Sequence, residues 1–304
     1  MHTRVTAPLP RLVAPAMRSL LSSVPISSAP AVPFYFNDYV HVELPKTNSF
    51  PMQKYRYVRQ ALERELTPRA LATFHQSPFA SVEDLCTVHA DAYVGRFLNN
   101  KLSRDENRRI GFPWSPASVN RALSSTGGTV AATHAVCRPG AAARFAGHIA
   151  GGTHHAFADR GEGYCVFNDI AVAAAVALRD YQDIRRVLIV DLDVHQGNGS
   201  ARIFAGDDRV FTASFQCEGN FFSARESSDL DVVTGGSTAS GESNGRRLRR
   251  PRPRRPRRPL APDPPATPPP LHVLHLVPHA YVVRLRTRLL AQLARLTGLA
   301  NRVR

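Results

Sequence analysis

One apolar run and the polar residues that follow it constrain this chain more than any other feature. The run RVLIV at 186–190 leads directly into DLDVHQGNG at 191–199. A short β-favouring apolar run is typical of a strand in a parallel sheet whose two faces are both covered. In α/β folds, ligand-binding chemistry lies at the carboxyl ends of such strands. We therefore expect an α/β protein with a functional site beside residues 191–199.

The polar residues after the run have the spacing of side chains that share one face. Side chains alternate along an extended chain, so Asp191, Asp193 and His195 are expected to point the same way. Asp193 and His195 then offer a carboxylate oxygen and an imidazole nitrogen to one point, which suits a borderline cation such as Zn²⁺. Gly197 and Gly199 permit a tight turn or a close approach. The alternative is an ordinary turn before a helix, in which His195 has no function.

Residues 34–232 alternate helical and strand patterns, which predicts a mostly parallel sheet flanked by helices. Helices are expected at 54–66, 81–85, from 91 to 100, at 115–136 and at 168–181. Strands are expected at 143–152, 185–194 and 209–215, and LCTVH at 85–89 is strand-like. The predicted fold class is a single-domain, three-layer α/β/α architecture.

Composition separates this body from the two ends of the chain. The net charge is +15, but residues 233–304 contain 15 Arg and two acids, so the remainder is nearly neutral. Four cysteines, Cys86, Cys137, Cys165 and Cys217, form no C-x-x-C pair, which argues against a disulfide framework. No apolar run is long enough to span a bilayer.

Both ends differ from the body. Residues 1–33 contain Arg and Ser but no acid, which fits either an organellar transit peptide or a disordered leader. Residues 233–304 are expected to be a disordered Arg/Pro-rich tail, with a basic helix at 281–303. The segment 246–258 alone has nine arginines and is a candidate polyanion or nucleic-acid contact; the alternative is a solvated tail.

A second cluster of polar residues follows the strand expected at 143–152. Here GGTHH at 151–155 places two adjacent histidines after two glycines. His154 and His155 are candidates for a general base and an electrostatic partner beside the metal. A carboxylate such as Asp191 would fix the tautomer of one imidazole, and Asn198 would orient the other without adding charge.

These stretches resemble the zinc-dependent histone deacetylase family, most closely its class IV branch and related bacterial deacetylases. The similarity covers about residues 34–232. It is carried by GGTHHAFADRGEGYCVFNDIAVAA (151–174), VLIVDLDVHQGNG (187–199), FPMQKYR (50–56), VHADAYVGRFL (88–98), RRIGFPWSP (108–116), STGGTVAA (125–132) and SDLDV (228–232). The resemblance implies a deacetylase/arginase-like fold around an eight-stranded parallel sheet, with zinc at the strand carboxyl ends.

The resemblance also implies roles for individual residues. Asp193 and His195 match two of three zinc ligands, and His154 and His155 match the tandem histidines that move protons. Asp191 and Asn198 match the partners of these two histidines. The substrate tunnel is matched by Tyr164, Phe222 and Gly163. A structural monovalent cation such as K⁺ is matched by Asp191, Ser214 and Phe215.

The implied reaction is hydrolysis of an acyl-lysine amide in a histone or another protein, with acetyl-polyamine hydrolysis as a small-molecule variant. Zinc would polarise the acyl carbonyl and activate water, and a histidine would take the water proton. The implied location is intracellular: an organelle (plastid or mitochondrion) if 1–33 is a transit peptide, otherwise the nucleus or cytoplasm.

Two family features are missing from the sequence pattern. The third zinc ligand, an Asp, and the oxyanion-stabilising Tyr have no matching motif, since only Glu242, Asp263 and Tyr281 remain after Asp231. FFSARESS at 221–228 and Gln216 also depart from the family pattern. Two hypotheses follow: a frameshift or mis-splicing near 233, so that the domain is truncated on its C-terminal side, or a catalytically inactive paralogue that binds partners through its Arg-rich tail.

Overall fold

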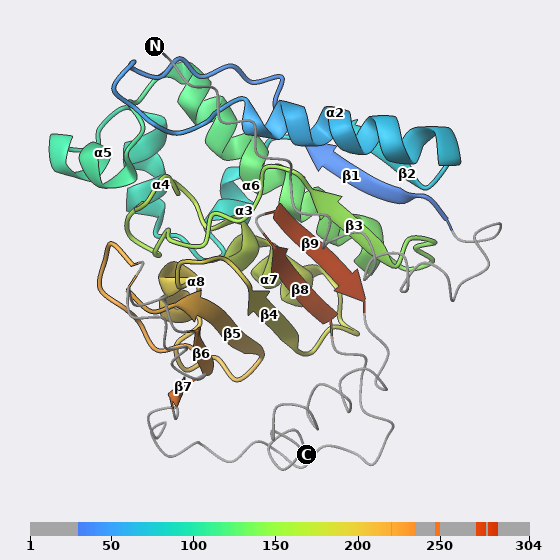
Figure 1. The fold of residues 1–304 in the computed structure, drawn as a ribbon. Coiled ribbons are helices and arrows are strands. Elements are labelled where there is room, and N and C mark those ends of the chain that lie inside the picture. The colour runs from blue at the N-terminus through green and yellow to red at the C-terminus, as the bar shows by residue number, and fades with distance from the viewer. Residues whose placement is uncertain (1–29, 220, 235–246, 250–271, 278, 285–304) are drawn as a thin grey trace, which may run out of the picture.

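The chain folds around one large sheet (Figure 1). The structure is a computed structural model, and it describes residues 30–219, 221–234, 247–249, 272–277 and 279–284. Within these residues the sheet has nine strands in the order β2-β1-β3-β9-β8-β4-β5-β6-β7. The pairs β1–β2, β1–β3, β4–β5, β4–β8 and β5–β6 are parallel. The predicted α/β class with a mostly parallel sheet is therefore confirmed.

The elements follow one another along the chain with short connections. The strands are β1 (Val32–Phe36), β2 (Ala72–Gln76), β3 (Phe145–His148), β4 (Val187–Asp191), β5 (Val210–Cys217), β6 (Leu230–Thr234), β7 (Arg247–Arg249), β8 (His272–Val277) and β9 (His279–Arg284). The helices are α2 (Lys54–Leu66), η1 (Thr67–Arg69), α3 (Val82–Leu85), α4 (Asp91–Leu98), α5 (Arg104–Ile110), α6 (Pro116–Cys137), α7 (Asp169–Asp180) and α8 (Asn198–Ile203).

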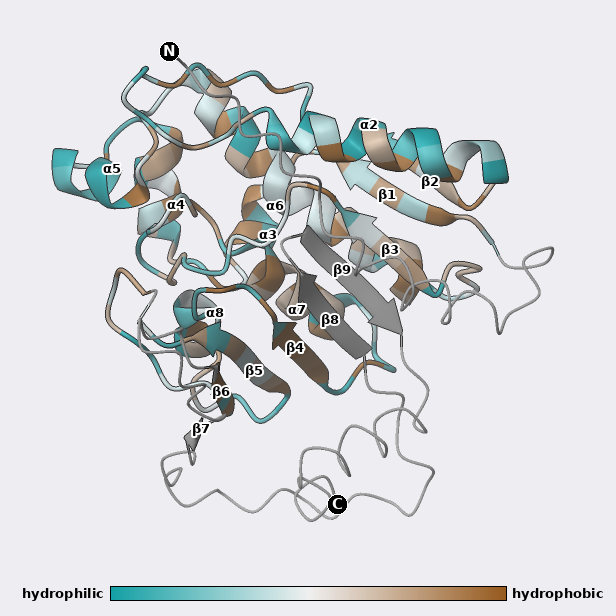
Figure 2. Cartoon of the chain, in the orientation of Figure 1, coloured by the Kyte–Doolittle hydropathy of each residue, from teal (hydrophilic) through white to brown (hydrophobic). Residues whose placement is uncertain are grey.

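Helices cover both faces of the sheet. On one face α6 and α7 pack against β3 and β4, and Ile170, Ala174 and Ile189 belong to their shared core. On the other face α2 covers β1 and β2, where the Phe34 and Phe74 rings stack. Strand β4 is apolar along most of its length (Figure 2), as a strand between two helical layers must be. This sandwich fixes the carboxyl ends of β3 and β4, where the polar residues lie.

Most local predictions for residues 34–232 are confirmed. Helices occupy 54–66, 116–137 and 169–180, and Asn168 caps the last of these by accepting a hydrogen bond from the Ala171 N–H. The strand-like interpretation of LCTVH is wrong, because α3 runs to Leu85 and turns follow it. His89 explains the difference: its ring donates to and accepts from backbone groups of other segments instead of lying along a strand. Strand β4 ends at Asp191, three residues before the expected end.

The predicted absence of regular structure in 233–304 is wrong for three short segments. Strand β7 pairs with β6, while β8 pairs with β4 and β9 pairs with β3, so β8 and β9 lie in the middle of the sheet. The helix expected over 281–303 is wrong at its start, because residues 279–284 form β9. The remainder of 233–304 lies outside the described residues, including most of 246–258. The two inner strands β3 and β4 thus have partners for their backbone groups, as a buried strand edge requires.

The physical reason is that composition was averaged over a window wider than the strands. HVLHLV at 272–277 is a short, apolar, β-favouring run directly after a proline-rich stretch. The expected leader, residues 1–33, lies almost wholly outside the described residues, and β1 begins at Val32. Among the described residues, no helix has the length and apolar character needed to cross a membrane.

Candidate functional site

The loop after β4 places the two predicted metal ligands together. Asp193 Oδ1 accepts a hydrogen bond from the His195 N–H at 2.8 Å and lies 3.1 Å from His195 Nδ1. Each of these side chains is about one-third exposed, at 33% and 34%. Leu192 and Val194, which alternate with them, point to solvent. The alternation of side chains therefore continues past the end of β4, and an exposed carboxylate–imidazole pair results.

Asp191, the last residue of β4, connects this loop to the histidine pair. Its Oδ1 accepts from the Asp193 N–H at 3.0 Å, and its Oδ2 lies 2.5 Å from His154 Nδ1. A side chain at Gly197 would overlap Asp191 Oδ2, so glycine is required for this approach. The structure thus brings Asp191 and His154 together as the sequence predicted.

The second histidine has an uncharged partner. His155 Nδ1 lies 2.8 Å from Asn198 Oδ1, which also accepts from the Gly199 N–H. Because that amide oxygen faces both groups, His155 Nδ1 is the donor, and its Nε2 carries a free lone pair. The His154 and His155 rings lie 4.0 Å apart between centroids, and His155 lies 5.8 Å from the His195 ring.

The two buried histidines have shifted pKa values of opposite sign. Burial opposes protonation of His154, but the charge and hydrogen bond of Asp191 outweigh it and raise its pKa above the usual 6.5. Burial and the neighbouring His154 lower the pKa of His155 to about 2. A protonated His154 beside a neutral His155 is the arrangement that a charge-stabilising residue and a general base require.

Aromatic rings border the histidines on the open side. The Phe222 ring lies 5.0 Å from His155 and 5.7 Å from His195, both edge-on, and is 56% exposed. Gly163 has a φ of 56° and backs this contact, since a Cβ there would lie 2.5 Å from Phe222 Cζ. Tyr164 packs against Phe50 and Phe112 at 4.9 and 5.0 Å. The three residues predicted to form a tunnel therefore border the site.

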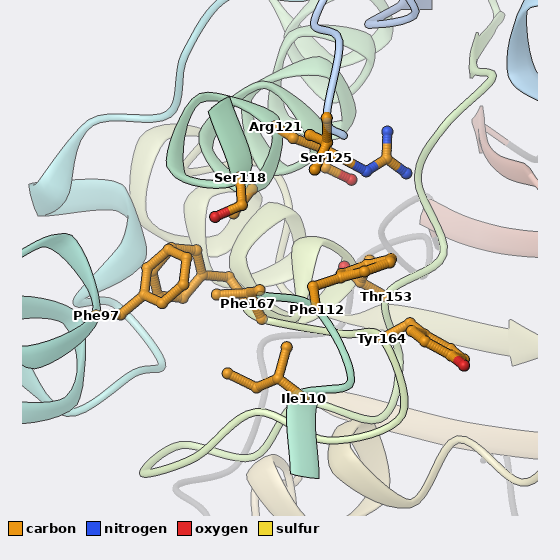
Figure 3. Close-up of a pocket in the computed structure, with 12 residues that line it drawn as sticks. Phe97, Ile110, Phe112, Ser118, Arg121, Ser125, Thr153, Tyr164 and Phe167 are labelled. Carbon is orange, nitrogen blue, oxygen red and sulfur yellow. The ribbon is translucent and has the colours of Figure 1, made fainter. Parts of the chain in front are cut away.

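A small cavity lies beside this border (Figure 3). Tyr164 and Thr153 contribute to its lining, and Phe97, Phe112 and Phe167 make much of it apolar. The buried Arg121 also lines it, with its guanidinium stacked 4.6 Å over the Tyr55 ring. The cavity thus adjoins the loop that carries the two histidines.

The predicted structural cation ligands are neighbours, but their polar atoms have protein partners. Asp191 and Ser214 lie opposite one another in the β4–β5 pair, and Phe215 follows. The Ser214 hydroxyl donates to Gln216 Oε1 at 2.6 Å. A monovalent cation at this place stays a prediction.

Two residues that sequence reasoning missed hold the histidine loop in place. Asp169 accepts hydrogen bonds from Gly152 N, Thr153 N, Thr153 Oγ1 and Thr129 Oγ1. His89 donates from Nδ1 to the Phe157 carbonyl and accepts from the Asn168 N–H at Nε2, both at 2.9 Å. The sequence indicated Asp169 only as a helix start, and nothing local marked His89.

The described residues supply an incomplete set of zinc donors. One carboxylate and one imidazole, Asp193 and His195, suit zinc in chemistry and exposure. Within the ranges that the structure describes, no group of three or more His, Cys, Asp or Glu side chains could hold a metal ion. A catalytic zinc usually has three protein ligands, so these residues alone do not complete the site.

Comparison with known proteins agrees with this geometry. The sequence profile of the histone deacetylase domain matches residues 48–243. An uncharacterized protein of Picosynechococcus sp. is 39% identical over 200 residues, which covers 65% of this chain and 64% of that protein. Histone deacetylase 19 of Arabidopsis thaliana is 34% identical over 159 residues, covering 48% of this chain and 30% of that protein.

More distant relatives include the acetoin utilization protein AcuC of Staphylococcus aureus, 42% identical over 74 residues, or 24% of this chain and 18% of that protein. The crystal structure of the HDA15 HD domain superposes with a TM-score of 0.51 at 20% identity, covering 64% of this chain and 56% of that one, which shows the shared fold. The chain spans less than two thirds of the length of each of these relatives. The profile match covers most of the described chain, and the chain belongs to the histone deacetylase family.

Proposed function

We propose that this protein is a lysine deacylase that hydrolyses the amide bond of acetyl-lysine or a related acyl-lysine in a histone or another protein. The observation that supports this most is the pairing of His154 with Asp191 and of His155 with Asn198, directly beside Asp193 and His195. Family membership supports the deacetylase reaction class. Zinc dependence, with Asp193 and His195 as two of the ligands, and a place in the class IV branch are finer parts of the same proposal.

The chain's own residues divide the proton chemistry between them. Neutral His155, with its Nδ1–H directed at Asn198, accepts the proton of an attacking water at Nε2. His154 keeps its proton through Asp191 and places positive charge near the oxyanion that develops on the acyl carbonyl. The proton that His155 gains is then delivered to the lysine nitrogen as the amide bond breaks.

The border of the site suits the substrate's shape. Phe222 and Tyr164 present partly exposed aromatic faces, and Gly163 leaves room between Phe222 and His155. Flat apolar walls fit the four methylene groups of a lysine side chain, whose acyl amide then reaches the histidines.

The test is an acetyl-lysine peptide assay on the purified chain with added zinc, run with and without a chelator. His155→Ala should lower kcat by roughly 100-fold or more, because a general base contributes about that factor. His75→Ala is the matched control, since His75 is an exposed histidine on β2. Undiminished turnover of the His155→Ala variant would remove the assignment of His155 as the base. An unaltered chain that shows no turnover with zinc present would contradict the proposed function.

A further inference from the structure

Gln196, the residue next to His195, has a fully used side chain. It is 1% exposed. Its Oε1 accepts from the Glu226 N–H at 3.0 Å, and its Nε2 donates to the Glu226 carbonyl at 2.7 Å and to Asp231 Oδ1 at 2.8 Å. One primary amide thus pairs with both backbone groups of Glu226, as a neighbouring strand would.

These bonds reach the segment that carries the aromatic border. Residues 218–229 connect β5 to β6, and Phe221 and Phe222 lie in this connection. Phe222 is largely exposed, so packing alone does little to fix it, and its place over His155 and His195 depends on the backbone beneath it. Asp231 adds a second hold on the same connection, because its Oδ2 accepts from the Ser228 N–H at 3.0 Å.

We infer that Gln196 is a positioning residue that ties the 218–229 connection to the β4 loop and thereby sets how tightly the site holds the lysine side chain. The inference rests on the proposed function for its effect on substrate. Gln196 donates and accepts at once, and no substitution by Glu, His or Met reproduces both bonds to Glu226. Because the tie lies behind Phe222 and away from the histidines' proton-transfer atoms, it should act on KM more than on kcat.

The first arm of the test measures the tie without any substrate. Glu226 N–H has Gln196 Oε1 as its acceptor, so its hydrogen exchange reports this bond directly. Gln196→Ala should speed that exchange about tenfold or more, because the amide then opens to water locally. Gln53→Ala is the matched control, an exposed glutamine at the start of α2 whose Oε1 accepts only from the Tyr57 hydroxyl among the described contacts. Unchanged exchange of Glu226 in Gln196→Ala would overturn the tie.

The second arm separates positioning from a general loss of structure. Gln196→Ala should raise KM for an acetyl-lysine peptide about tenfold with kcat within about twofold, the pattern of lost substrate binding. Gln196→Glu should do the same or worse, because the new carboxylate faces that of Asp231. Adding Asp231→Asn should recover part of the loss. The amide introduced at position 231 can donate to the carboxylate at position 196, while its oxygen still accepts from the Ser228 N–H.

A loss confined to kcat, or no recovery in the double variant, would contradict the positioning role. No turnover by the unaltered chain would remove the proposed function and the effect on KM with it. In that case the exchange of the Glu226 amide still decides whether the tie exists.

Discussion

His154 and His155 are consecutive residues, yet their surroundings favour opposite protonation states. Asp191 lies against one ring and a neutral amide oxygen against the other, although the rings are only 4.0 Å apart. Each charged or uncharged partner comes from the β4 loop and the start of α8, so a single neighbouring segment sets both states. Pairs of titratable groups whose pKa values are pushed apart in this way are typical of acid–base sites.

Gly163 offers a residue-scale test of how closely the aromatic border must approach these rings. Its φ is 56°, and a Cβ would lie 2.5 Å from Phe222 Cζ and 2.9 Å from His155 Cδ2. We expect Gly163→Ala to lower kcat/KM about tenfold or more, because Phe222 or His155 must shift, and backbone strain should cost about 1 kcal/mol of unfolding free energy.

The matched control is Gly140→Ala, whose φ of 73° imposes the same kind of strain while nothing lies within 4 Å of the added Cβ. Steady-state kinetics and urea unfolding of both variants separate the two effects. Equal kinetic losses in Gly140→Ala and Gly163→Ala would show that close contact at residue 163 has no role.

The sequence predicted the residues of the site better than it predicted the residues that hold them. The partners of His154 and His155 followed from the spacing of polar residues at two strand ends and from the family resemblance. Asp169, His89 and Gln196 act through contacts with segments far away in the chain, such as the 79 residues between His89 and Asn168. No local pattern carries such information, because each looks like a helix start, a loop histidine or a turn residue.

At the scale of elements, the start of α7 and the α3–α4 turn form the support of the histidine loop. Asn168 caps α7 and also donates to the carbonyls of His154 and Ala156, at 3.3 and 3.0 Å. His89, between α3 and α4, accepts from the Asn168 N–H. The helices were predictable from spacing and capping residues, but the turn at 86–89 was not, since its alternating apolar residues imitate a strand.

His89 gives this support a pH dependence. Burial lowers its pKa to about 4, against an ordinary 6.5. A histidine with a depressed pKa in the folded state stabilises the fold above pH 6.5, and this contribution is lost as pH falls towards 4. The loss should be about 3 kcal/mol for a shift of this size.

His89→Gln removes the titrating group. We expect a lower unfolding free energy at pH 7, because two hydrogen bonds change, but a smaller further loss between pH 7 and pH 4 than in the unaltered chain. Some loss remains, since His155 also has a lowered pKa. Urea unfolding at pH 7, 5.5 and 4 checks this, with the exposed His75→Gln as control. An equally steep loss in His89→Gln would exclude His89 as its source.

At the scale of the whole molecule, one sheet carries both the expected body and three strands from the basic segment. The body's order was foreseeable, because alternating helices and short apolar strands leave few other architectures. The strands β8 and β9 were not, because the prolines and arginines around them dominate any average over that region. Backbone groups of β3 and β4 supply the missing physical reason, since inner strands require partners on both edges.

Zinc binding is the property that tests the whole assembly, because a metal site collects donors from several strand ends. Asp193 and His195 are two donors on one loop, and within the described residues no larger cluster exists. We expect this chain to bind zinc roughly a hundredfold or more weakly than a three-ligand catalytic site. Competition against a chelating dye gives the affinity, and equilibrium dialysis gives the stoichiometry.

Asp193→Asn and His195→Gln should each abolish the residual binding, while Asp159→Asn, which removes a carboxylate with 71% side-chain exposure, should leave it unchanged. One zinc per chain retained through dialysis would contradict the expectation. It would require a third donor from outside the described residues, and Glu242 and Asp263 are the only carboxylate side chains there. Substituting each in turn would then identify which one reaches the metal, and the proposed deacylase would gain the ligand that the described residues lack.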